Sequence, residues 1–323
     1  MFTQSETLKA PFPWFGRKTS VANEVWRRLG DVPNYVEPFF GSGAVMLGRP
    51  HEPKTETIND KDGFLSNFWR AVQHDPEAVA GYADWPVNEN DLHARHSWLV
   101  REGPPIVSRL EGDPDFYDAK IAGWWVWGLC SWIGSGWCFG VGPWHSVDGE
   151  LVNTRNDVAG TWCQLPHLSG GQGINRNRPH LKGGQGITEW FTALSERLRR
   201  VRVCCGDWKR VCGPSPTVKN GITGVFLDPP YAHSERNDGL YRVEMAVADE
   251  VREWAIEHGN DPKLRIALCG YDGEHDMPGW DCYGWNAHGG YGSQSSGRAR
   301  ANAKRERIWF SPHCLNACPG LVF

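Results

Sequence analysis

Two features that the sequence lacks exclude common classes of protein. None of the 10 cysteines forms a Cys-x-x-Cys pair, so we expect no structural zinc, no other bound metal, and reduced thiols in a cytoplasmic setting. An excess of positive charge is also missing, because 34 Lys and Arg face 38 Asp and Glu, for a formal net charge of -4. Wholesale nucleic-acid binders are usually basic, so only a local basic surface is compatible with this composition.

The chain also lacks the marks of export and of membrane insertion. Its first six residues show no basic region followed by an apolar run, so we expect no signal peptide. The stretch from Ile121 to Trp144 carries no formal charge and is long enough to span a bilayer. Tryptophan and glycine interrupt its middle, however, whereas tryptophan in a span belongs at the interfaces. We therefore expect no membrane span, and we expect many of the 18 tryptophans to lie in a core or to stack on flat ligands such as bases.

Strand and helix patterns alternate at both ends of the chain. The first part predicts a helix over 19–29 capped by Ser20, a strand over 34–40, a short helix over 44–47, a strand ending at 57–60 and a helix over 64–72. The last part predicts helices over 189–200 and 243–258 and strands over 201–205, 224–227, 264–269 and 306–310. Short apolar strands separated by helices indicate an α/β fold with a parallel sheet covered on both faces.

The middle of the chain breaks this alternation. Residues 75–187 mix Pro, Gly, Trp and polar residues, which predicts an irregular or mainly helical insertion inside a discontinuous domain formed by 1–74 and 188–323. The insertion ends in a tandem repeat, in which 166–174 recurs as 179–187 with the pattern Pro-His-Leu-x-Gly-Gly-Gln-Gly-Ile. The two copies are either duplicated surface loops or a pair of loops that contact nucleic acid.

A glycine-rich turn follows the first predicted strand. In Phe39-Phe40-Gly41-Ser42-Gly43, the glycines allow the backbone to approach a ligand and direct a helix N-terminus at it. Asp60 ends the next strand, about twenty positions on, where nucleotide-binding sites place an acidic partner of the ribose hydroxyls. Together the turn and Asp60 indicate an adenosine-containing cofactor, although a turn followed by a helix-capping aspartate would have the same sequence.

The segment Asp228-Pro229-Pro230-Tyr231 is the more specific signal. It follows an apolar strand, and ligands of open α/β sheets bind at the carboxyl ends of strands. Two prolines build a rigid loop without N–H donors. Asp228 and the carbonyl of Pro229 would then offer two acceptors to an amine, while Tyr231 would offer a flat face on which a base can stack.

The order of these motifs resembles that of the Dam-like DNA adenine methyltransferases, over residues 1–72 and about 188–312. The matching segments are Trp14-Phe15-Gly16-Arg17-Lys18, Glu37-Pro38-Phe39-Phe40-Gly41-Ser42-Gly43, Asn59-Asp60, Gly206-Asp207-Trp208, Asp228-Pro229-Pro230-Tyr231 and the strand that begins at Arg305-Glu306. Arg17 and Trp208 depart from the family, which often has Gly and Phe there.

This resemblance implies a Rossmann-like methyltransferase sheet that binds S-adenosylmethionine and double-stranded DNA, with the insertion as target-recognition domain. It implies a catalytic segment comprising Asp228, Pro229, Pro230 and Tyr231, with Asp228 and Tyr231 holding the base. It implies a cofactor pocket formed by Trp14, Lys18, Glu37, Pro38, Phe39, Gly41, Gly43, Asp60, Asp207 and Trp208. From the basic clusters and the repeat, candidate DNA contacts are Lys182, Arg199, Arg200, Arg298 and Arg300. No obligate protein partner is evident, so we expect a monomer or weak dimer.

Several alternatives remain open at this stage. Methylation of the cytosine N4 amine uses the same chemistry, and an RNA amine is a further possible substrate. A nicotinamide-dependent oxidoreductase would require Gly-x-Gly-x-x-Gly, and the turn has Met46 in place of the third glycine. A non-catalytic DNA-binding module would not need an intact Asp-Pro-Pro-Tyr segment.

Overall fold

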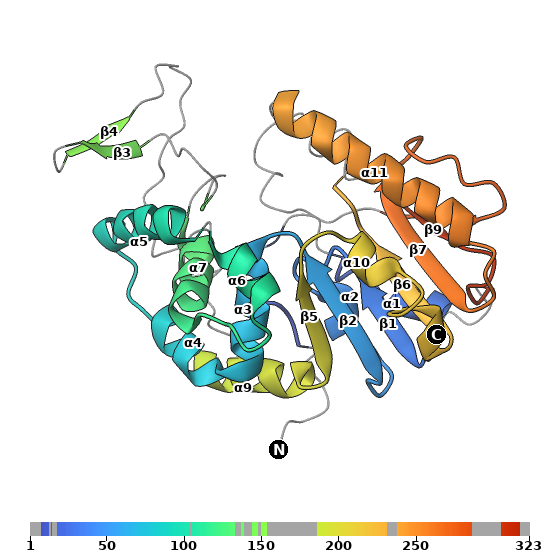
Figure 1. Cartoon of the computed structure of the whole chain (residues 1–323), viewed down its shortest axis with the longest axis horizontal. Coiled ribbons are helices and arrows are strands. Elements are labelled where there is room, and N and C mark those ends of the chain that lie inside the picture. Colours follow the sequence, from blue (N-terminus) through green and yellow to red (C-terminus); the bar gives the residue numbers. More distant parts are fainter. Residues whose placement is uncertain are drawn as a thin grey trace. The chain divides into compact units, whose positions relative to one another are not determined.

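The computed structural model describes residues 8–12, 14, 18–103, 105–132, 137–138, 144–147, 150–153, 186–230, 238–285 and 305–316. The chain forms two compact units. Unit 1 comprises residues 1–10, 14–61 and 200–323, and unit 2 comprises 11–13 and 62–199. Unit 1 contains a seven-stranded sheet, and unit 2 is mainly helical (Figure 1).

The sheet of unit 1 has the strand order β5-β2-β1-β6-β7-β9-β8. The strands are β1 (Asn34–Glu37), β2 (Thr55–Asp60), β5 (Val201–Cys205), β6 (Thr223–Leu227), β7 (Leu264–Tyr271), β8 (Asp281–Gly284) and β9 (Glu306–Phe310). The five strands from β5 to β7 are parallel, whereas β9 is antiparallel to both of its neighbours. This confirms the predicted α/β class and its Rossmann-like arrangement, and it adds an antiparallel edge to the expected parallel sheet.

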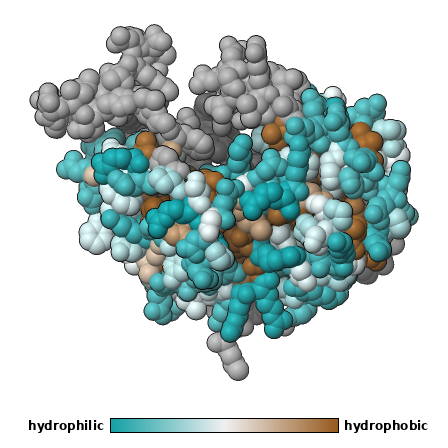
Figure 2. Space-filling model, in the orientation of Figure 1, coloured by the Kyte–Doolittle hydropathy of each residue, from teal (hydrophilic) through white to brown (hydrophobic). Residues whose placement is uncertain are grey.

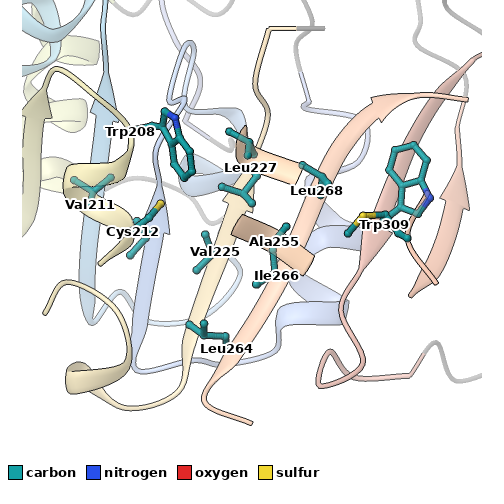
Figure 3. Packing of buried hydrophobic residues seen from close by; sticks show 13 residues of the cluster. Trp208, Val211, Cys212, Val225, Leu227, Ala255, Leu264, Ile266, Leu268 and Trp309 are labelled. Atoms are coloured by element: carbon teal, nitrogen blue, oxygen red, sulfur yellow. The ribbon is translucent and has the colours of Figure 1, made fainter. Parts of the chain in front are cut away.

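Both faces of this sheet are covered by helices. Val211 of α10 and Ala255 of α11 belong to a buried apolar cluster with Ile266 of β7 (Figure 3). On the other face, α1 approaches β6 so closely that a Cβ built on Gly224 would lie 3.2 Å from Leu29. The helical elements of unit 1 are α1 (Ala22–Leu29), α2 (Ala44–Leu47), α10 (Lys209–Cys212), α11 (Asp238–His258) and the 3₁₀ turn η1 (Val218–Asn220). Burial on both faces explains the apolar runs of residues 224–227 in β6 and 266–269 in β7.

Two predicted element bounds need correction, and one strand was not predicted. Strand β1 ends at Glu37 rather than at residue 40, because Pro38 has no N–H with which to continue the ladder. Helix α1 begins at Ala22, and Ser20 does not cap it: residues 18–21 form a turn in which the carbonyl of Lys18 accepts from two backbone amides. Strand β8 escaped prediction because its four residues are all exposed and show no apolar alternation.

Unit 2 consists of helices that begin at capping side chains. Asp62, Asp75, Asn88 and Asp118 precede α3 (Gly63–His74), α4 (Pro76–Ala83), α5 (Glu89–Glu102) and α7 (Ala119–Ser131). Each of these four side chains accepts a hydrogen bond from a backbone amide of the first turn. The unit also contains α6 (Ile106–Gly112), α9 (Ile187–Leu198) and an antiparallel pair, β3 (Trp144–Val147) and β4 (Glu150–Asn153).

Aromatic side chains form the core of unit 2. The ring of Phe68 on α3 lies 5.3 Å from that of Phe12 and 5.8 Å from that of Phe191. Trp69 and Trp125 are buried against the same group of rings. Buried tryptophans in both units confirm that part of the tryptophan excess is core.

The boundary of unit 2 differs from the predicted insertion of residues 75–187. Helices α3 and α9 both belong to unit 2, which therefore starts at Asp62 and ends at Arg199. Two hydrogen bonds join these helices. The side-chain amide of Gln73 donates to the backbone carbonyl of Leu198 at 2.6 Å, and Ser195 Oγ donates to the backbone carbonyl of Gln73 at 2.9 Å. The flanking helices thus pack with the insertion, and its recognition role stays a prediction.

Among the described residues, no helix is long and apolar enough to cross a membrane. The first part of the uncharged stretch, residues 121–131, lies in α7, a helix of 13 residues, and residues 133–136 and 139–143 lie outside the described part of the chain. On the face drawn in Figure 2, hydrophilic residues predominate and apolar residues are scattered, which fits the burial of the large apolar side chains.

The buried apolar cluster that includes Ile266 of β7 yields a stability prediction. Ile266→Ala should lower the free energy of unfolding by about 3 kcal/mol, because Ile266 is fully buried and its loss leaves a cavity. Ile256→Ala on α11 is the matched control: Ile256 is 45% exposed, so its loss should change this free energy by less than about 0.5 kcal/mol. Denaturant titration followed by circular dichroism measures both variants, and equal effects would contradict the cluster as a source of stability.

Candidate functional site

The candidate site lies where the connections of the sheet change direction. Strands β1 and β6 pair in parallel from Asn34↔Thr223 to Val36↔Val225. From β1 the chain proceeds to β2 on one side, and from β6 it proceeds to β7 on the other. The loops after β1 and β6 therefore leave in opposite directions from the same edge, which is where open α/β sheets bind ligands.

The loop after β1 is a glycine turn held against the end of β2. Gly41 and Gly43 have φ of 50° and 62°, a region that residues with a Cβ rarely adopt. The amide of Gly41 donates to Asp60 Oδ2 at 3.1 Å. A Cβ built on Gly41 would lie 2.5 Å from Nε1 of Trp14, so this indole lies directly against the turn. The structure thus brings together four of the predicted cofactor residues.

Asn59 of β2 joins the loops after β1 and β5 at this edge, a role that the sequence analysis did not assign. Its side-chain amide donates to the carbonyls of Pro38 and Gly206, each at 3.0 Å, and its own carbonyl accepts from the amide of Phe40 at 3.0 Å. The amide of Gly206 in turn donates to the carbonyl of Asp60 at 3.0 Å. Asn59 is 1% exposed, so these bonds are shielded from water.

The loop after β5 contributes an aromatic wall. The rings of Phe39 and Trp208 lie 6.1 Å apart at 34°, and Trp254 meets Trp208 edge-on. Nε1 of Trp208 is buried and has no hydrogen-bond partner within the described part of the chain, and in Figure 3 the nitrogen is on the side of the ring toward the carboxyl end of β6. Asp207 is exposed beside it and accepts from the amide of Lys209 at 2.9 Å.

Glu37 lies inside the fold rather than on a ligand surface. Its carboxylate accepts from the hydroxyl of Tyr35 at 2.8 Å, and the side chain is 2% exposed. Burial raises the pKa of Glu37 well above its usual range, and the nearby charge of Asp228 raises it further, against the hydrogen bonds from Tyr35 and from the amide of Met46. The carboxyl group of Glu37 therefore holds β1 and α2 together, which differs from the predicted direct cofactor contact.

Lys18 pairs with the aspartate of the loop after β6. Its Nζ lies 3.0 Å from Asp228 Oδ2 and 3.7 Å from Glu306 Oε2, and Lys18 is 4% exposed. The sequence analysis placed Lys18 in the cofactor pocket and gave Glu306 no role. In the same loop, Pro229 is buried and Pro230 is exposed.

The remaining predicted contacts are less central or lie beyond the described part of the chain. Arg200 is exposed and directly precedes β5, which runs parallel to β2, so it lies at the edge of the sheet opposite to Asp60. This position favours a solvated surface over a contact beside the site. Arg199 is an exposed residue at the end of α9 in unit 2. Four candidates lie outside the described residues: Lys182, Tyr231, Arg298 and Arg300.

Comparisons with known proteins agree with this architecture. Residues 14–94 match a family model described as D12 class N6 adenine-specific DNA methyltransferase. A DNA N-6-adenine-methyltransferase of Escherichia phage P1 is 26% identical over 99 residues, which cover 29% of this chain and 13% of that protein. A DNA adenine methylase of Vibrio cholerae serotype O1 is 32% identical over 84 residues, which cover 26% of this chain and 30% of that protein.

These matches confirm the resemblance to Dam-like DNA adenine methyltransferases for the N-terminal part of the chain. The family-model match includes the glycine turn and Asp60, and it ends before Asp228. The aligned regions span less than a third of either relative. The evidence that the glycine turn and the Asp228 loop belong to one site is therefore the strand pairing of β1 with β6.

The glycine turn yields a prediction for Gly41→Ala. The new Cβ would collide with Trp14 at a residue with positive φ, so the free energy of unfolding should fall by about 1–3 kcal/mol. Gly213→Ala is the matched control, because Gly213 has φ of -71° and a Cβ there would meet nothing within 4 Å. Denaturant titration compares the variants, and an unchanged midpoint for Gly41→Ala would show that the turn does not require glycine.

Proposed function

We propose that this protein transfers a methyl group from S-adenosylmethionine to the N6 amine of adenine in double-stranded DNA. The observation that carries the proposal is the parallel pairing of β1 and β6, which brings the glycine turn and the Asp228 loop to one edge of the sheet. A methyltransferase needs this arrangement because the methyl donor and the acceptor amine must meet within reacting distance.

The residues of the first loop fit an adenosine-containing methyl donor. Gly41 and Gly43 form a tight turn with positive φ, and Asp60 is anchored beside this turn to receive ribose hydroxyls. Phe39 is only partly buried and offers a flat apolar surface for an adenine ring, and the buried N–H of Trp208 beside it has no hydrogen-bond partner among the described residues. When bound, the donor supplies an electrophilic methyl group on a sulfonium.

The residues of the second loop fit an exocyclic amine. The two acceptors of this loop, the Asp228 carboxylate and the carbonyl of Pro229, can receive the two amine hydrogens and direct the nitrogen lone pair at the methyl group. Tyr231 supplies the stacking surface expected for a base extruded from the duplex. Positioning and charge placement then account for most of the rate, because no covalent enzyme intermediate is needed.

Nucleoside analysis tests the proposal directly. The protein is incubated with duplex DNA of known sequence and S-adenosylmethionine that carries an isotopically labelled methyl group. The DNA is then digested to nucleosides and analysed by mass spectrometry. Labelled N6-methyladenine is the expected product. Labelled N4-methylcytosine, or label in RNA alone, would replace the proposed substrate, and no label in any nucleic acid would overturn the proposed activity.

The proposal predicts the behaviour of Asp228→Ala. Removing the acceptor should reduce methyl transfer by about 10³-fold or more, because the amine is no longer oriented. Cofactor affinity, measured by calorimetry, should stay within about twofold of the wild-type value, since Asp228 belongs to the loop after β6. Asp249→Ala on the surface of α11 is the control and should retain wild-type activity. Wild-type turnover by Asp228→Ala would remove Asp228 from the mechanism.

A further inference from the structure

Glu306 occupies a position at the candidate site that follows from the direction of its strand. Because β9 runs antiparallel to β7, its first residue lies beside the carboxyl end of β7, where Glu306 pairs with Tyr271. The carboxyl ends of β6 and β7 meet at the same edge of the sheet. A carboxylate from the far end of the chain therefore reaches the loop that follows β6.

A single buried cation joins this carboxylate to the loop. The ammonium group of Lys18 lies 3.0 Å from Asp228 and 3.7 Å from Glu306, and the ring of Trp285 lies 5.9 Å away. Burial by itself would lower the pKa of Lys18, but the negative charges of Asp228 and Glu306 and the hydrogen bond to Asp228 outweigh it and raise the pKa above its ordinary value. Lys18 is therefore an ammonium ion that cannot act as a base.

Lys18 is paired with two carboxylates, Asp228 and Glu306, rather than with one. Arg49 elsewhere in unit 1 also has two carboxylate partners, Glu56 at 3.2 Å and Asp31 at 3.4 Å, but the second of these, Asp31, is 47% exposed to water. Here a second carboxylate, 6% exposed, is buried beside the same cation. Its desolvation opposes folding. A functional contribution to the placement of Lys18 would explain why it is present.

We propose that Glu306 and Lys18 are positioning residues for Asp228, and that Glu306 acts only through Lys18. Lys18 binds one oxygen of the Asp228 carboxylate and fixes its plane, so that the carboxylate is oriented toward the amine of the target base. Glu306 holds the ammonium group in place from the start of the antiparallel strand β9. This inference rests on the proposed methyl transfer, and it adds to it two residues that control the orientation of Asp228.

A double-mutant cycle tests the dependence of Glu306 on Lys18. The rate of methyl transfer to duplex DNA is measured in a single turnover for wild type, Glu306→Gln, Lys18→Met and the double variant. We expect losses of about 10-fold for Glu306→Gln and about 100-fold for Lys18→Met, because each lets the carboxylate drift from its productive position. The double variant should be as slow as Lys18→Met alone, since Glu306 acts on Asp228 through the ammonium group that Lys18→Met removes. Calorimetric affinity for the cofactor should change by less than about twofold throughout.

Two further variants separate positioning from structural support. Glu56→Gln removes a carboxylate that is equally buried and paired but belongs to no loop of the site, so it should lower the melting temperature and leave the single-turnover rate unchanged. If Lys18→Met does not fold, Lys18→Arg takes its place, because it keeps the charge and displaces the cation.

The outcomes distinguish this inference from the activity on which it rests. A wild-type protein that methylates no DNA overturns the proposed function and this inference with it. An active wild type in which the two losses multiply in the double variant, or in which Glu306→Gln reacts at the wild-type rate, overturns the inference alone. An equal loss of rate in Glu56→Gln assigns the effect to general stability and overturns it as well.

Discussion

The parallel pairing of β1 with β6 is the constraint on which the organisation of unit 1 depends. These strands are adjacent in the sheet but far apart in the sequence, and their register aligns Val36 with Val225. A slip of one residue would exchange the faces of the strand and move its apolar side chains out of the core. The same register fixes how far the glycine turn and the Asp228 loop extend beyond the sheet. Packing in the core thus determines the spacing of the site.

Buried polar groups then connect the loops that this pairing brings together. Asn59 ties the loops after β1 and β5 through three hydrogen bonds to backbone atoms, and it does so from the interior. Lys18 joins the loop after β6 to the start of β9 by charge. Such groups oppose folding unless they are paired, and the apolar cluster around Ile266 offsets that cost. Polar residues at this edge are better explained by the geometry they impose than by stability.

The sequence predicted the parts of the fold that depend on local pattern. The short helix α2 and the strands β5 and β9 have the predicted bounds, because apolar periodicity and glycine positions are local signals. Strand β8 was missed because its residues are exposed and its existence depends on pairing with β9. The start of unit 2 at Asp62 was missed because the Gln73 and Ser195 hydrogen bonds that join α3 to α9 connect residues far apart in the sequence.

The site shows the same division between local motif and long-range contact. The glycine turn and Asp60 were predicted together because their spacing is a sequence signature, and the hydrogen bond from Gly41 to Asp60 confirms that they meet. The role of Glu306 could not be predicted, since it depends on an antiparallel strand returning to the edge at which Asp228 lies. The signal in the sequence was an acidic residue at the first position of a strand that ends in three apolar residues.

The helices of unit 2 and the segment 154–185 differ in the sign of their net charge, and this difference bears on the proposed DNA substrate. Its described stretches over 62–103, 105–132 and 187–199 contain 13 Asp and Glu against 7 Lys and Arg. A surface of that sign repels phosphates, and proteins bind the DNA backbone by neutralising phosphates with Lys and Arg. Residues 154–185, which contain the first copy of the repeat and the start of the second, have 4 Lys and Arg and 1 Asp. Charge therefore favours this segment over the acidic helices as the source of phosphate contacts.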